Sequence, residues 1–288
     1  MQKNSFVKIH GLGNEYIVID SQNIGFELTT AAIRRICNVN FGIGSDGVLV
    51  LVGSETADIG LRIFNPDGSE AEKSGNGLRI FCKYVFDYGV VTKTAFTVET
   101  KGGIVSAQIA QIKNQRAHTV TVEMGKAIFD AELIPTKFAS KQVDDTLISI
   151  EGKPFYVNCV SVGNPHCVIL KDDLVIEEIK HYGPLLEHYE MFPNRINVQF
   201  AKVINRSEVE ILIWERGAGF TLASGTSSCA VASVLRKKGL IDERVTMKML
   251  GGTLQITVDD NYMITMTGEV REICSGVLSD ELIEDFSS

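Results

Sequence analysis

The sequence has 288 residues, enough for one large domain or two of ordinary size; 44% of them are apolar and 22% are charged. The formal net charge of −8 disfavours a nucleic-acid-binding function, because phosphate contacts need a basic patch. No apolar run reaches the length of a membrane span, and the first residues lack the layout of a signal peptide. The six cysteines form no CxxC pair, so we expect a cytoplasmic protein with buried thiols rather than disulfides or zinc ligands.

In chain order, the hydrophobic pattern predicts strands and helices in a mixed α/β arrangement. An outer helix is expected over residues 29–37, and residues 171–188 are expected to be helical in parts. Two further helices are expected to begin at Ser74 and Ser224 and to end at glycines. Alternating apolar and polar residues predict the strands, at 5–20, 57–65, 155–170 and 208–215, with hairpins around Gly102-Gly103 and Gly251-Gly252.

These elements recur at a nearly constant spacing of about 150 residues, which indicates an internal duplication. The recurring landmarks are Gly13-Asn14 with Gly163-Asn164, Arg62–Asn65 with Leu212–Glu215, Ser74-Gly75 with Ser224-Gly225, Gly89 with Gly239, and the two Gly-Gly pairs. Chance agreement of common loop residues is the alternative, but five landmarks in one order favour duplication. We expect two domains, residues 1–118 with 270–288 and residues 119–269.

The two serine turns, KSGNGLRIF and ASGTSSCAV, occupy equivalent places in the repeats. A serine before a helix is most simply an N-cap. However, the free N–H groups of a helix start also bind anions such as carboxylates. If the repeats pack face to face, both helix starts point into one cleft, and Ser74 and Ser224 flank one carbon atom. Such a pair suits proton transfer on opposite faces of that carbon.

Several stretches resemble the ordered motifs of the diaminopimelate epimerase family: HGLGNEYIVID, FGIGSDGVLVL, RIFNPDGSEAEKSGNGLRIF, SVGNPHCVIL, FPNRINVQF and WERGAGFTLASGTSSCA. They span nearly the whole chain. The resemblance implies two pseudo-symmetric α/β domains, each a sheet wrapped around a central helix, with the active site between them. It also implies an isomerase that interconverts LL- and meso-diaminopimelate for lysine and cell-wall precursor synthesis. That enzyme uses two cysteines, with no cofactor and no metal, and acts on a small amino-acid substrate without nucleic-acid or membrane partners; a homodimer is left open.

Residue by residue, the resemblance assigns catalytic positions to Ser74 and Ser224, which stand where the family has cysteine, with His166 and Glu215 beside the reacting centre. The implied substrate contacts are Asn14, Asn65, Gly75, Asn76, Asn164, Asn197, Glu215, Arg216, Gly225 and Thr226. Arg216 would clamp a carboxylate with two hydrogen bonds. Each of these residues can also be interpreted as purely structural: an asparagine in a turn, a surface ion pair or a histidine of the core.

The sequence departs from the family pattern at Phe220 and Gly47 as well as at the two serines. A serine hydroxyl is a far weaker acid than a thiol and is not an alkoxide without a strong partner base. Three hypotheses follow. The chain is a diaminopimelate epimerase that binds but turns over poorly, or it is a serine-based isomerase, tautomerase or dehydratase acting on a more acidic carbon. Otherwise it is a non-catalytic amino-acid-binding protein with this fold.

Overall fold

The structure, a computed structural model, describes residues 2–287 and divides into two compact units. The first unit combines residues Met1–Val122 with Thr267–Ser288, and the second is the continuous stretch Glu123–Met266. The chain passes between units inside two strands that pair with each other, β8 and β17. The boundary therefore lies within regular strands, and the expected boundaries at 118/119 and 269/270 fall in or next to the same two strands.

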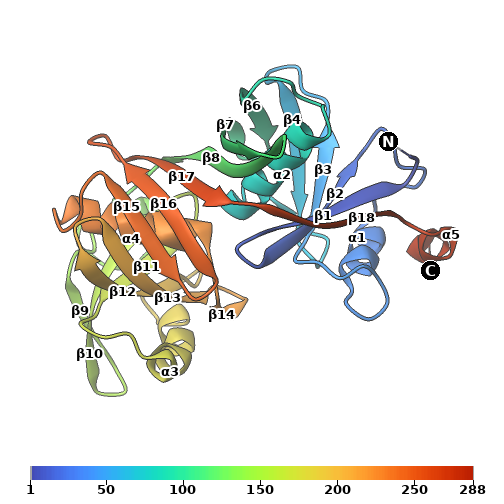
Figure 1. The fold of residues 1–288 in the computed structure, drawn as a ribbon. Coiled ribbons are helices and arrows are strands. Elements are labelled where there is room, and N and C mark those ends of the chain that lie inside the picture. The colour runs from blue at the N-terminus through green and yellow to red at the C-terminus, as the bar shows by residue number, and fades with distance from the viewer. Residues whose placement is uncertain (1, 288) are drawn as a thin grey trace. The chain divides into compact units, whose positions relative to one another are not determined.

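The first unit contains a mixed sheet in the order β18-β1-β2-β3-β4-β6-β7-β8, with the short β5 paired to β4. β2 and β3 are parallel, as are β4 and β6. Figure 1 shows β18, near the end of the chain in red, running along β1, the first strand in blue. The strand bounds are β1 Ser5–Gly11, β2 Asn14–Asp20, β3 Val48–Val52, β4 Ile59–Phe64, β5 Glu70–Ala71, β6 Ala95–Thr100, β7 Gly103–Lys113, β8 Arg116–Lys126 and β18 Arg271–Val277.

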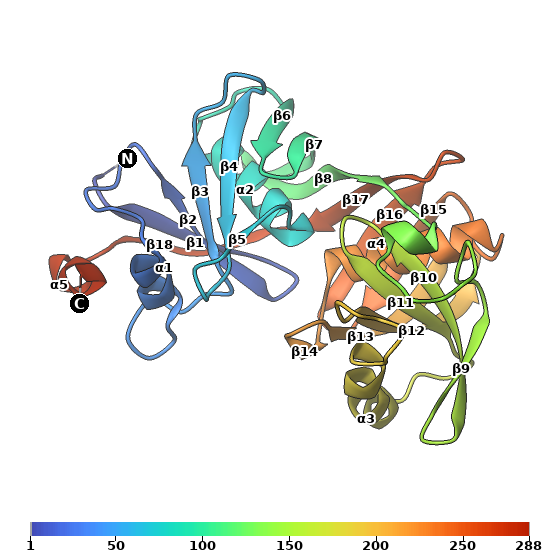
Figure 2. The ribbon, with the colours of Figure 1, turned by 180° about the vertical axis from the view of Figure 1, so that it is seen from behind.

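Helix α2 (Gly75–Asp87) is the centre of this unit and contacts β1, β2 and β7. Every residue from Gly75 to Val85 is buried, so the helix is covered on all sides rather than lying on a surface. The opposite face of the sheet packs against α1 (Thr30–Cys37) and the C-terminal α5 (Asp280–Glu284) and η2 (Asp285–Ser287). Figure 2 shows these C-terminal turns on the same side of the sheet as α1.

The apolar run of β3 follows from this layering. Val48 and Val50 belong to the core beside α1, while Leu49 lies against α2, where its Cδ2 would be 3.1 Å from a Cβ at Gly77. Since both faces are covered, the strand is apolar throughout instead of alternating.

The second unit repeats this plan. Its sheet runs β9-β10-β11-β12-β13-β15-β16, with β14 paired to β13, and the β11–β12 and β13–β15 pairs are parallel. Helix α4 (Gly225–Lys237) contacts β10, β11, β12, β15 and β16, and α3 (Ile176–Glu187) covers the other face. The remaining bounds are η1 Ala131–Leu133, β9 Thr146–Ile150, β10 Lys153–Ser161, β11 Pro165–Leu170, β12 Asn197–Asn205, β13 Glu208–Glu215, β14 Gly219–Thr221, β15 Arg244–Met249, β16 Gly252–Val258 and β17 Met263–Glu269.

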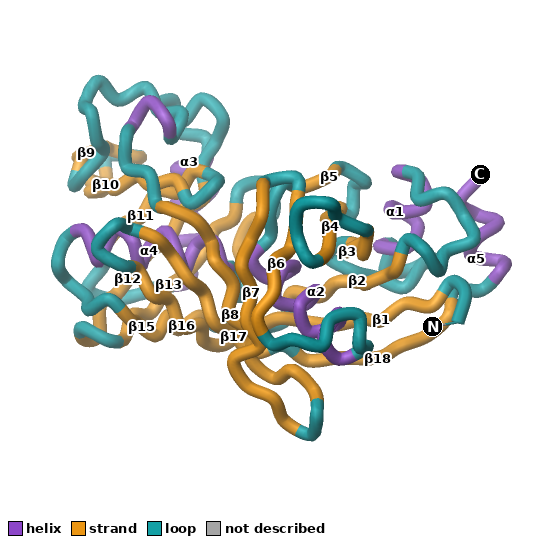
Figure 3. The backbone as a smooth tube through the Cα atoms, turned by 90° about the horizontal axis from the view of Figure 1, so that it is seen from above, coloured by secondary structure: helices purple, strands orange, loops and turns teal. Residues whose placement is uncertain are grey.

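The mixed α/β class with a central helix in each unit is therefore confirmed, and so are the predicted helices. α2 and α4 have 13 residues each and begin one residue after Ser74 and Ser224. Each is followed by a glycine with positive φ, 71° at Gly89 and 69° at Gly239. Figure 3, in which helices are purple and strands orange, shows α2 and α4 each beside the strands of its own unit.

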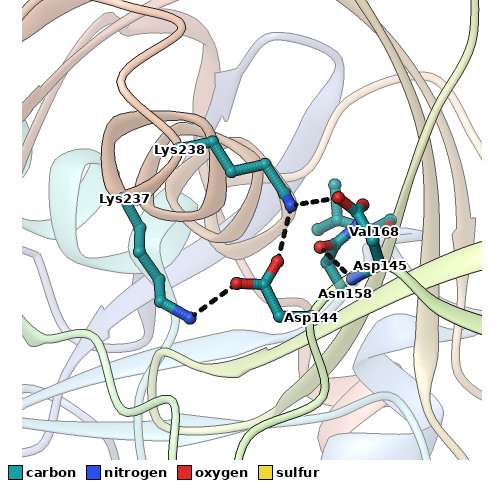
Figure 4. A network of polar contacts seen from close by, with 6 residues as sticks. All are labelled: Asp144, Asp145, Asn158, Val168, Lys237 and Lys238. Carbon is teal, nitrogen blue, oxygen red and sulfur yellow. Dashed lines mark hydrogen bonds and ion pairs between the residues drawn. The ribbon is translucent and has the colours of Figure 1, made fainter.

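The basic cluster at the end of α4 ties that helix to a loop of its own unit (Figure 4). Lys238 Nζ contacts Asp144 Oδ1 at 2.5 Å and Asp145 Oδ2 at 2.8 Å, and Lys237 Nζ contacts Asp144 Oδ2 at 3.2 Å. Asn158 extends the network, because its Nδ2 donates to Asp145 Oδ1 and to the carbonyl of Val168 on β11. The cations also suit the negative end of the helix dipole, so this cluster positions α4 within the unit.

Candidate functional site

The start of α2 carries Ser74 as its N-cap, with φ −139° and ψ 119°. Its Oγ accepts a hydrogen bond from the backbone N–H of Gly77 at 3.1 Å. The same Oγ lies 3.3 Å from the hydroxyl of Tyr16, which projects from β2. Ser74 thus caps the helix, as a serine there should, and also meets a second hydroxyl group that the sequence motifs do not single out.

A chain of side-chain hydrogen bonds fixes the asparagines around this helix start. Arg79 Nη2 donates to Asn76 Oδ1 at 2.8 Å, Asn76 Nδ2 donates to Asn14 Oδ1 at 3.0 Å, and Asn14 Nδ2 donates to Asp46 Oδ2 at 2.7 Å. A guanidinium only donates and a carboxylate only accepts. The two ends therefore dictate which way both amides point. These hydrogen bonds fix which side-chain atom donates and which accepts in Asn14 and Asn76, two of the predicted substrate contacts.

Arg79 acts on the helix start in a second way. It is fully buried, and its Nη1 donates to the carbonyl of Gly75 at 3.3 Å. That carbonyl belongs to the peptide whose N–H is on Asn76, one of the predicted donors to a carboxylate. A charged donor on the oxygen polarises the peptide and strengthens its N–H as a donor. Asn65, the remaining predicted contact of this unit, follows β4, and its Nδ2 donates to Ser69 Oγ at 3.0 Å in the turn 65–69.

The start of α4 has the same form with different neighbours. Ser224 is 5% exposed, and its Oγ accepts from the N–H of Ser227 at 3.4 Å and lies 3.4 Å from Thr226 Oγ1. Its backbone N–H points to the sulfur of Met249, which also contacts the hydroxyl of Ser228. The surroundings of Ser224 are hydroxyl groups, backbone and a thioether, and the phenol found beside Ser74 has no equivalent among them.

His166 lies fully buried beneath this helix start. Its Nε2 is 2.8 Å from Asn164 Oδ1, and its Nδ1 is 3.1 Å from Gln199 Nε2, which also donates to Ser227 Oγ. Because Asn164 Oδ1 can only accept, Nε2 carries a proton and donates to Asn164. Burial is the main reason that the pKa of His166 falls to about 3; the nearby Arg216 lowers it further, while the Gln199 contact opposes the shift. His166 therefore orients Asn164 with both ring nitrogens engaged.

Asn197 and Arg216 are joined at the edge of the same unit. Asn197 Nδ2 donates to the carbonyl of Pro165, and its Oδ1 accepts from the backbone N–H of Arg216 at 2.9 Å. Arg216 Nη1 donates to the carbonyl of Asn194, and Glu215 ends β13 one residue earlier. Glu187 holds the following turn by accepting from the N–H of Gly217 and from Trp214 Nε1.

The cysteines nearest to the two serines are in no position to replace them. Cys82 and Cys229 are both fully buried on the apolar sides of α2 and α4. Burial raises the pKa of the Cys82 thiol well above its usual range, with Arg79 opposing the shift only in part. A thiol in that state is not a thiolate base near neutral pH.

Two groups of predicted residues are thus brought together, one in each unit. Ser74, Gly75, Asn76 and Asn14 meet at the start of α2. Ser224, Gly225 and Thr226 lie at the start of α4, to which Gln199 links His166 and its partner Asn164. Asn197 bonds to Pro165, the neighbour of His166, and to Arg216, which follows Glu215 at the end of β13. The sequence patterns missed Tyr16, Asp46, Arg79 and Gln199. The signal that could have indicated Arg79 and Gln199 is a polar residue at a position where the pattern expects burial, since such residues need hydrogen-bonded partners.

A cavity of about 840 Å³ in the second unit lies apart from these groups. It opens beside the start of α3, and its three lysines pair with carboxylates, Lys153 and Lys171 with Glu178 and Lys202 with Asp173. None of the predicted site residues lines it. Among residues 2–287 no three His, Cys, Asp or Glu side chains are grouped to hold a metal ion, and no helix there is long and apolar enough to cross a bilayer.

The two units repeat one fold, each with a serine-capped central helix, and the comparisons with known proteins place the chain among the isomerases of the epimerase and racemase class. The family model for diaminopimelate epimerase matches residues 6–129 and 158–273. The chain belongs to the diaminopimelate epimerase family. It is 49% identical to "Diaminopimelate epimerase 2" of Nostoc sp., covering 96% of both chains, and 41% identical to the diaminopimelate epimerase of Acetivibrio thermocellus, covering 94% of this chain and 97% of that one.

The solved structure of a hydroxyproline epimerase from Agrobacterium vitis shares the fold, with a TM-score of 0.72 and 16% identity over 95% of this chain and 90% of that one. At this level of identity the likeness concerns the fold alone.

Proposed function

We propose that this chain binds diaminopimelate and moves its α-proton between Ser74 and Ser224, which would act on opposite faces of the α-carbon. The observation that carries the proposal is the equivalence of the two helix starts, each with a serine cap and N–H donors at the same place in its repeat. The names of the relatives support diaminopimelate as the substrate. A cleft in which the two units face each other is part of this proposal, as is LL- to meso-diaminopimelate conversion in the cytoplasm for lysine and cell-wall precursors.

The chemistry follows from the charges that the reaction creates. Loss of the α-proton places an electron pair next to the carboxylate, and N–H donors at a helix start stabilise that developing charge. Asn14 and Asn164, with their amides fixed by Arg79 through Asn76 and by His166, would hold the polar groups of the amino acid. Arg216 would bind a carboxylate. Because a hydroxyl is a much weaker acid than a thiol, the serine pair makes proton removal the slow step.

The test is exchange of the α-hydrogen of LL- and meso-diaminopimelate in heavy water, followed by NMR, with binding measured separately by calorimetry. We expect the native chain to bind both isomers and to exchange slowly. The Ser74→Cys/Ser224→Cys protein should exchange about 10²- to 10⁴-fold faster. At neutral pH a cysteine thiol is partly ionised to a thiolate, which is a stronger base than the un-ionised hydroxyl of serine. Ser74→Ala/Ser224→Ala is the matched control, and should bind without exchange.

Two results would redirect the proposal. Exchange by the native chain on another carbon acid, with none on diaminopimelate, would favour a serine-based isomerase, tautomerase or dehydratase. The burial of Cys82 and Cys229 supports that alternative, because neither thiol is placed to replace the serines. Tight binding with no exchange in either the native or the cysteine form would favour a non-catalytic binding protein. Sedimentation of the native chain tests the homodimer at the same time.

A further inference from the structure

The contact between Tyr16 and Ser74 has no counterpart in the second unit. Residue 166, which stands 150 positions after Tyr16, is a histidine whose two ring nitrogens face Asn164 and Gln199. Ser224 Oγ is placed instead beside Thr226 and the N–H of Ser227. Among the described residues, therefore, only the serine of the first unit has a phenol as hydrogen-bond partner.

We infer that Tyr16 is a proton-relay residue for Ser74, so that the hydroxyl pair does on one face of the substrate what a single thiol would do. The inference rests on the proposed function, and Tyr16 acts through Ser74 rather than by touching the substrate. A phenol ionises near pH 10, far more readily than an alcohol. A phenolate beside Ser74 is the partner base that a serine needs to become a useful proton acceptor.

The geometry leaves room for such a relay. One lone pair of Ser74 Oγ accepts from the N–H of Gly77, which leaves its hydroxyl hydrogen and its other lone pair for Tyr16 and the substrate. Tyr16 is mostly buried but 7% exposed, so it keeps some contact with the solvent that takes up its proton. A Cβ at Gly47 would lie 2.4 Å from the carbonyl oxygen of Phe64 and 2.7 Å from Tyr16 Cε1, so the glycine leaves room for the backbone as well as for the tyrosine ring.

The proton balance of the step is simple. Tyr16 first loses its hydroxyl proton to solvent. The α-carbon–hydrogen bond then breaks as its proton moves to Ser74 Oγ, while the hydroxyl proton of Ser74 moves to the oxygen of Tyr16. The electron pair stays on the substrate, shared with its carboxylate at the helix start. In the reverse direction, Tyr16 returns a proton to Ser74 as Ser74 protonates the carbon.

The test compares Tyr16→Phe with Tyr88→Phe, a matched control in the same unit whose hydroxyl donates to Glu272 at 3.3 Å. We expect Tyr16→Phe to slow exchange by about tenfold or more for the isomer whose α-hydrogen faces Ser74, and to affect the other isomer much less. Its binding constants should stay within about twofold of native, as should all values for Tyr88→Phe. In a Ser74→Cys background, adding Tyr16→Phe should change exchange by less than about twofold, because a thiol ionises without the phenol.

Several outcomes overturn the inference. Equal slowing of both isomers, or the same loss in the Ser74→Cys background, would mean that Tyr16 only supports the structure. Native-like exchange in Tyr16→Phe would remove the relay outright. Exchange that appears only in the cysteine forms would show that Tyr16 does not activate Ser74, while leaving the proposed binding site intact. Absence of binding by the native chain in calorimetry would contradict the proposed function, and the relay would fall with it.

Discussion

His166 shows how burial decides the role of a single side chain. The family pattern places it beside the reacting centre, and in the structure its ring is fully buried with both nitrogens in contact with an amide side chain. Burial depresses the pKa of His166 to about 3, which favours the neutral ring at neutral pH. The ring contacts Asn164 Oδ1 and so sets which way that amide points.

The depressed pKa of His166 predicts a pH dependence of stability. Unfolding restores a pKa near 6.5, so below that value the unfolded chain binds a proton that the folded chain does not. Stability from this site is complete above about pH 6.5 and is lost towards pH 3, by about 1.4 kcal/mol for each pH unit. Urea unfolding of the second unit between pH 7.5 and 5, followed by fluorescence of Trp214, the only tryptophan, measures it.

The comparison that isolates this effect is His166→Gln against His181→Gln, whose ring is exposed. The His166→Gln protein should lose much of the downward slope below pH 6.5, while His181→Gln should keep it. A slope that is identical in all three proteins would mean that His166 takes up its proton in the folded state as readily as in the unfolded state.

At the scale of elements, the two N-caps should differ in strength. Ser74 Oγ is 3.1 Å from the N–H that it caps, whereas Ser224 Oγ is 3.4 Å from its own. We expect Ser74→Ala to lower the free energy of unfolding by about 1 kcal/mol, and Ser224→Ala by less, since an N–H is left without its acceptor in each case. Far-UV circular dichroism in urea measures the first, and Trp214 fluorescence the second.

Ser106→Ala, on the exposed side of β7, is the surface control for these caps and should leave stability unchanged. Should Ser74→Ala prove as stable as native, the hydroxyl would be held for chemistry alone and the capping bond would contribute nothing.

The sequence predicts elements here better than it predicts contacts. The starts of α2 and α4 can be predicted because the serine, the glycine and the 3.6-residue period of apolar residues all indicate a helix beginning at the same place. The contact of Tyr16 with Ser74 joins positions 58 residues apart, and the Gln199–Ser227 bond joins positions 28 apart. No local pattern records such pairs, because they exist only once the strands are wrapped around the helix. The unit boundary was obscured for a similar reason, since it falls inside β8 rather than in a loop.

At the scale of the whole chain, the two units differ in how they are assembled. The second is one continuous stretch with its own apolar core, whereas the first needs both ends of the chain. Leu278 and Phe286, from the far end, belong to the core beside α1. We therefore expect residues 123–266 alone to unfold cooperatively in urea with a shift of Trp214 emission, and residues 1–122 alone to remain unfolded.

Circular dichroism of the two fragments at equal concentration provides the measurement, and adding residues 267–288 to the first fragment is the complementing control. Cooperative unfolding of residues 1–122 by themselves would mean that the C-terminal strand and helix are accessories rather than parts of that core.

The pairing of β1 with β18 also has a consequence for biosynthesis. Domains usually fold in the order in which they leave the ribosome. Here β1 leaves the ribosome before the second unit but must wait for β18, which follows that unit, so the second unit should finish folding first. Until β18 has been made, β1 presents an open β-edge that chaperones can bind.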